Sequence, residues 1–99
     1  MKVYRGDRTL DGLEVTVDSA PLDPKLDVKT ISQNGYEWGY AGPEPAQLAF
    51  AILCEHYGDT EKAAKDYPTF MEAIVANFNN EWEMSSDDID VALKNIGCR

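Results

Sequence analysis

The chain has 99 residues, a length that predicts a single domain covering residues 1–99. Its formal net charge of −9 argues against nucleic acid and anionic membrane surfaces as partners, because both attract clusters of lysine and arginine. Hydrophobic residues make up 43% of the chain, without an apolar run of membrane-spanning length or a secretory signal, so we expect a folded, cytoplasmic protein.

The first third of the chain has the pattern of strands and turns. A short strand is predicted over residues 2–5, followed by a turn at residues 6–7. Strict alternation of apolar and polar side chains predicts a second strand over residues 13–17, entered through a hairpin-type turn at residues 11–12. A third strand, with weaker alternation, is predicted over residues 26–31.

The next segment carries three aromatic side chains at alternate positions. An Asn-Gly turn at residues 34–35 precedes Tyr36, Trp38 and Tyr40, which would share one face of an extended segment. Gly42 and the prolines that follow it end this segment and open a helix, since proline suits the first helical turn.

The rest of the chain is predicted to be helical. An unbroken apolar run predicts a buried central helix over residues 46–57, which Gly58 would end. A short helix capped by Asp59 or Thr60 is expected to run through Asp66.

Two more helices complete the predicted order of elements. Pro68 is expected to begin one that ends at residues 79–80, and Ser85 or Ser86 to cap the last, which Gly97 would stop. Strands followed by helices predict an α+β fold, with an antiparallel sheet of three to four strands in the N-terminal half packed against three to four helices in the C-terminal half.

Two segments resemble a known family. They are YRGDR at Tyr4–Arg8 and GYEWGYAGPEPAQLAFAIL at Gly35–Leu53. With them the chain resembles a family of small uncharacterised prokaryotic and phage proteins, a domain of unknown function. The resemblance implies a similar fold and carries over no activity. The chain departs from the family pattern at residues 41–45, where an extra proline stiffens the loop and Glu44 fills the place of a bound anion at the helix N-terminus.

The strongest candidate site is the glycine- and aromatic-rich loop before the central helix. Helix N–H groups hold anions, aromatic rings stack on flat ligands, and arginine supplies a guanidinium. The candidate ligand-binding residues are Arg5, Arg8, Tyr36, Trp38, Gly39, Tyr40 and Gly42. The structural alternative is that the aromatic rings pack in the core and that an arginine pairs with Asp7 or Glu37.

Patterns typical of catalysis or metal binding are not recognised in the sequence. His56 is the only histidine and is expected at the surface, near a helix C-terminus. Cys54 points to the other side of that helix and is expected in the core, whereas Cys98 is expected to be exposed. The sequence predicts no metal and no cofactor, and it predicts that the acidic residues from 81 to 90 form a solvated face.

Three classes of function follow from these observations. The leading hypothesis is a non-enzymatic binding protein, in the form of a phage-type accessory or counter-defence inhibitor, which acts on a basic protein partner through an acidic surface. The alternative is a protein that binds a nucleotide or another small anion at residues 36–42. An enzyme is the least supported class, because no nucleophile–base pair is evident. We expect a monomer or weak dimer.

Overall fold

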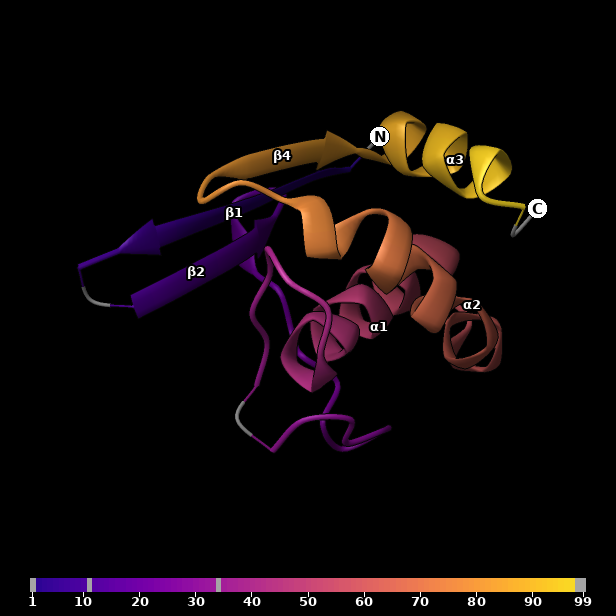
Figure 1. The fold of residues 1–99 in the computed structure, drawn as a ribbon, viewed down its shortest axis with the longest axis horizontal. Coiled ribbons are helices and arrows are strands. Elements are labelled where there is room, and N and C mark those ends of the chain that lie inside the picture. Colours follow the sequence, from indigo (N-terminus) through magenta and orange to yellow (C-terminus); the bar gives the residue numbers. More distant parts are fainter. Residues whose placement is uncertain (1, 11, 34, 98–99) are drawn as a thin grey trace.

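The computed structural model describes residues 2–10, 12–33 and 35–97, and it confirms the predicted α+β fold (Figure 1). Four antiparallel strands form one sheet in the order β3-β2-β1-β4. The elements in chain order are β1 (Val3–Thr9), β2 (Gly12–Val17), β3 (Ala20–Pro21), α1 (Pro43–Tyr57), α2 (Thr60–Ala73), the 3-10 turn η1 (Val75–Asn77), β4 (Trp82–Ser85) and α3 (Ser86–Asn95).

The first strand continues through the turn that the sequence predicts at residues 6–7. β1 pairs with β2 as far as Thr9 opposite Gly12, which confirms the predicted hairpin, although Asp11 lies outside the described residues. The turn prediction is wrong because Gly6 belongs to the sheet, where it lies opposite Trp82 of β4. The missing Cβ of Gly6 makes room for the indole ring of that tryptophan.

Alanine at Gly6 is expected to lower the free energy of unfolding by about 1–3 kcal/mol, the usual cost of overpacking. A Cβ there would overlap the indole ring of Trp82, and this indole is stacked on Phe78 at a centroid distance of 4.3 Å. Urea denaturation measures the loss. The same substitution in a Trp82→Leu background should cost much less, and an equal cost in both backgrounds would contradict the steric explanation.

The third and fourth strands differ from the prediction. The third is the two-residue β3, reached through a turn in which Asp18 and Ser19 have positive φ, and the strand predicted over residues 26–31 is wrong. The described residues between positions 22 and 42 contain no helix or strand. β4 comes from the C-terminal part of the chain and pairs with β1, so the sheet joins both ends of the sequence.

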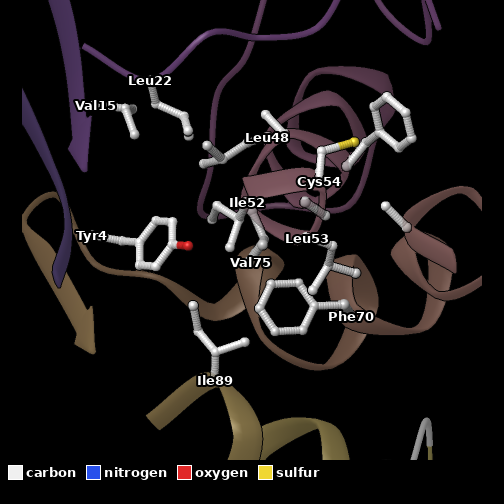
Figure 2. Close-up of a cluster of buried hydrophobic side chains, with 14 of the residues drawn as sticks. Tyr4, Val15, Leu22, Leu48, Ile52, Leu53, Cys54, Phe70, Val75 and Ile89 are labelled. Carbon is white, nitrogen blue, oxygen red and sulfur yellow. The ribbon is translucent and has the colours of Figure 1, made fainter. Parts of the chain in front are cut away.

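Helix α1 is the buried centre of the fold, as the sequence predicts. Every residue from Pro45 to Cys54 is buried, and Gly58 closes the helix with a φ of 66°. Figure 2 shows side chains of the sheet, of α1 and of α3 meeting in one cluster. Its labelled members are Tyr4, Val15, Leu22, Leu48, Ile52, Leu53, Cys54, Phe70, Val75 and Ile89.

Helix α2 is a single helix, although the sequence predicts two helices separated before Pro68. Asp59 caps it as expected, because its carboxylate accepts the N–H groups of Glu61 and Lys62. Pro68 lies inside the helix without ending it. The carbonyl that loses its hydrogen bond belongs to Ala64, which is exposed, so water can replace the missing N–H.

Helix α3 begins with the predicted serine cap. The hydroxyl of Ser85 accepts the N–H of Asp88, whose carboxylate accepts the N–H of Ser85 in return. The expectation that His56 lies at the surface is wrong, since its side chain is 9% exposed. Its Nε2 lies 2.8 Å from Oδ1 of Asp90, so this contact joins the end of α1 to α3.

Candidate functional site

An open pocket of about 630 Å³ lies where Arg8 of β1 meets two loops. Ligand pockets in proteins span roughly 300–1,000 Å³, so the hollow is large enough to receive a ligand or side chains of a partner. One wall comes from the loop before α1 and the other from the loop before β4. The lining residues are Arg8, Trp38, Gly39, Tyr40, Phe78, Asn79, Asn80 and Glu81.

Four of the seven predicted site residues line this pocket: Arg8, Trp38, Gly39 and Tyr40. Gly39 has a φ of 87° and donates its N–H to the carbonyl of Val75 at 3.1 Å. This turn separates the two neighbouring aromatic side chains, because Trp38 is fully buried and Tyr40 is 43% exposed. The expectation that the aromatic side chains share one face of an extended segment is therefore wrong.

The other three predicted residues lie outside the pocket lining. Arg5 points to the outer face of the sheet, where its Nε lies 2.6 Å from Oε1 of Glu83. Tyr36 is half-buried and donates its hydroxyl to the carbonyl of Leu22 at 3.1 Å. Gly42 is the residue before the first turn of α1.

The guanidinium of Arg8 already has partners inside the protein. It forms an ion pair with Glu37 at 2.5 Å, as the structural alternative predicts, and it donates to the carbonyl of Trp38 at 2.7 Å. It also donates to Oδ1 of Asn80 and lies over the Trp38 ring, 5.0 Å from the ring centroid. The positive charge in the pocket wall is thus balanced by a carboxylate that touches it.

The N-terminus of α1 has few free N–H groups that could bind an anion, although the sequence analysis expects such donors there. Pro43 and Pro45 occupy two of the first three helical positions and carry no N–H. The N–H of Ala46 is bonded to the carbonyl of Gly42 at 3.0 Å. Glu44, between the prolines, brings its own carboxylate to this end of the helix.

The Glu44 carboxylate is held by two hydroxyl groups. Tyr40 donates to its Oε1 at 2.8 Å and Ser32 to its Oε2 at 3.0 Å. These hydrogen bonds lower the pKa of Glu44, because they favour the charged form. Partial burial and the bond to Glu44 raise the pKa of Tyr40 to about 12. At neutral pH the tyrosine hydroxyl at the pocket therefore stays a donor, and the carboxylate behind it stays charged.

Gln47 holds the loop before α1 in place, a role that the sequence analysis missed. Its side chain is fully buried. Its Oε1 accepts the N–H groups of Ile31 at 2.7 Å and Ser32 at 3.1 Å, and its Nε2 donates to the carbonyls of Pro24 at 2.6 Å and Lys29 at 3.1 Å. Two of these bonds, to the N–H of Ile31 and the carbonyl of Lys29, engage backbone groups in the segment predicted as a strand over residues 26–31. The sign of this role in the sequence was a polar amide side chain inside an otherwise apolar helical run.

The second wall of the pocket was also missed. Residues 79–80 were interpreted as the end of a helix and Glu81 as part of a solvated acidic face, and the structure places residues 78–81 together with Arg8 in the pocket lining. Phe78 stacks on Trp82, which packs edge-to-face on Trp38 at 5.9 Å. Two adjacent asparagines in a loop were the available signal, because loops with polar side chains often carry binding sites.

The acidic residues from 81 to 90 have structural roles at several positions. Glu83 pairs with Arg5, Asp88 caps α3 and Asp90 contacts His56. Within the described ranges, no three metal-ligating side chains gather into a potential metal site. Cys54 is buried as predicted, and burial raises the pKa of its thiol, whereas Cys98 lies outside the described residues.

Comparison with known proteins places the chain in a family. Residues 4–95 match DUF6166, a family of unknown function. The chain belongs to this family. The matched range includes the sheet apart from Val3, the three helices and every residue that lines the pocket. No curated protein and no solved structure matches the chain. Over the part of the chain that the structure describes, no helix has the length and apolar character needed to cross a membrane.

Proposed function

We propose that this chain is a non-enzymatic binding protein that acts on a basic protein partner through its acidic surface. The observation that carries the proposal is the pairing of Arg8 with Glu37 at the pocket. Because this carboxylate balances the guanidinium, Glu81 in the lining leaves the pocket region with an excess of negative charge. A cation is therefore favoured there over an anion.

The side chains most often used in catalysis are engaged elsewhere. His56 is nearly buried against Asp90, and Cys54 is buried in α1 with a raised pKa. Neither residue belongs to the pocket lining. This arrangement supports a binding role, because a general base or nucleophile must reach its substrate.

The net charge of −9 supports the same proposal at the level of the whole molecule. A strongly acidic protein associates fast with a basic surface, and its charge keeps copies of itself apart. A phage-type accessory or counter-defence inhibitor would work in this way, as a cytoplasmic monomer or weak dimer that covers a basic surface of its target.

The alternative function is the binding of a small anionic ligand such as a nucleotide. Arg8 in the pocket wall favours it, together with the exposed ring of Tyr40 as a stacking surface. The anion would have to compete with Glu37 for the guanidinium. The Glu44 carboxylate at the start of α1 would oppose it as well.

Titration calorimetry with oligolysine and with ATP separates the two functions. We expect oligolysine to bind with an affinity that falls as salt is raised, and ATP not to bind, because the pocket region is acidic. Glu81→Gln should weaken oligolysine binding more than the matched control Asp87→Asn on α3. The proposal would be contradicted, and the alternative established, if the protein bound ATP but not oligolysine and if Arg8→Ala abolished the ATP binding.

A further inference from the structure

We infer that the β1–β2 hairpin and the pocket beside it form one docking surface, and that it receives a protein segment in which lysine or arginine is flanked by apolar side chains. The inference rests on the proposed function and specifies its surface and the partner's chemistry. It is carried by where the protein exposes apolar side chains and by the charges around them.

The hairpin reaches beyond the helices at one end of the molecule (Figure 1). Leu10 at its tip is fully exposed, with a relative accessibility of 108%. Leu13 lies directly opposite Arg8 in the register of the two strands and is 37% exposed. Arg8 lines the pocket, so the apolar end of the hairpin is continuous with the pocket wall.

Exposed large apolar side chains occur in the pocket lining and on the adjoining end of the hairpin. The described residues expose five of them: Leu10, Leu13, Val28, Tyr40 and Val91. Three belong to the hairpin end or the pocket lining, whereas Val28 lies in the loop before α1 and Val91 on α3. Single exposed apolar residues are ordinary, but a group beside a hollow marks an interaction site.

The charges on the hairpin favour a basic partner. Asp7 and Glu14 lie directly opposite each other on the outer face, and like charges in this position repel. The neighbouring cation, Arg5, is engaged by Glu83. On the pocket side, Glu81 forms no ion pair among the described residues. A lysine or arginine beside Glu81 would pair with this carboxylate, whereas Asp7 and Glu14 lie on the other face of the sheet and add only to the overall negative charge.

A second copy of this chain fits the surface less well than a different protein. Two chains of net charge −9 repel each other, so the overall charge opposes an interface between two copies. A basic segment has the opposite charge, and apolar residues beside its cation would cover Leu10, Leu13 and Tyr40. Both parts of the surface are then matched by one occupant.

Nuclear magnetic resonance titration of the labelled protein tests this inference. The probe is a synthetic peptide of alternating arginine and leucine, compared with peptides of alternating arginine and serine and of alternating glutamate and leucine. We expect amide shifts to change at residues 8–10, 12–13, 38–40 and 78–81, and we expect the arginine–leucine peptide to bind most tightly. Leu10→Ser should weaken it about tenfold, because buried apolar anchors carry much of the affinity of an interface.

Val91→Ser is the matched control, since it also removes an exposed apolar side chain and should leave the affinity unchanged. The docking surface would be overturned if the amide shifts changed only on other surfaces and if Leu10→Ser and Val91→Ser bound the peptide with the same affinity. The proposed function would then still stand. Failure of every basic peptide to bind would overturn both. If the protein self-associates in sedimentation experiments and Leu10→Ser abolishes this self-association, the occupant is a second copy of the chain. That result would overturn the assignment of a basic partner.

Discussion

Replacing Gln47 with alanine is expected to lower the free energy of unfolding by about 3 kcal/mol or more. The substitution removes the partner of the buried N–H group of Ser32, and the partners of a partly buried N–H group on Ile31 and of two partly buried carbonyls in the loop before α1. Each buried polar group left without a partner costs about 1–3 kcal/mol, partly recovered when the loop relaxes toward water. Urea denaturation measures the loss, and faster hydrogen exchange at Ile31 and Ser32 would locate it.

Gln47→Met is the matched variant for this prediction. Methionine has a similar length and keeps the apolar packing, but it forms none of the four hydrogen bonds. We expect Gln47→Met to lose most of the stability that Gln47→Ala loses. A methionine variant as stable as the natural protein would show that the amide fills space in the core and does not hold the loop.

The central helix was predictable because one local pattern was enough to specify it. The unbroken apolar run in α1 predicts burial on all sides, and proline and glycine mark its two ends. The serine cap of α3 and the aspartate cap of α2 follow from equally local signals. These three features are fixed within a few residues of sequence, and their prediction was correct.

Features that depend on distant contacts were not predictable in the same way. In the sequence alone, Gly6 has the pattern of a turn residue. Its role in the sheet becomes clear only in the fold, where the indole ring of Trp82, far along the chain, packs against it. β4 is four residues long, too short for its alternation to predict a strand. The loop before α1 has apolar residues spaced like a strand, but the side chain of Gln47 takes up its backbone groups instead.

The candidate site was half predicted for the same reason. Arg8 and residues 38–40 stood out because glycine and aromatic residues precede a helix. The opposite wall at residues 78–81 meets them only once β4 pairs with β1. The structural alternative predicted that an arginine pairs with Asp7 or Glu37, and the structure forms this ion pair between Arg8 and Glu37. The proposed function rests on that pair.

Replacing Trp38 with alanine is expected to lower the free energy of unfolding by about 3–5 kcal/mol, the usual cost of removing a buried aromatic ring. The Trp38 side chain is fully buried and packs edge-to-face against Trp82 at 5.9 Å. Its ring also supports the guanidinium of Arg8 at 5.0 Å. Urea denaturation measures the loss of stability, and basic-peptide binding should weaken in the same variant because the pocket wall loses its support.

Trp38→Phe separates packing from the polar contribution of the indole. The indole N–H of Trp38 is buried and finds no hydrogen-bond partner among the described residues. Phenylalanine keeps an aromatic ring for Arg8 and Trp82 and removes that unpaired donor, so its cost should be well below that of alanine. A phenylalanine variant as unstable as the alanine variant would contradict this expectation.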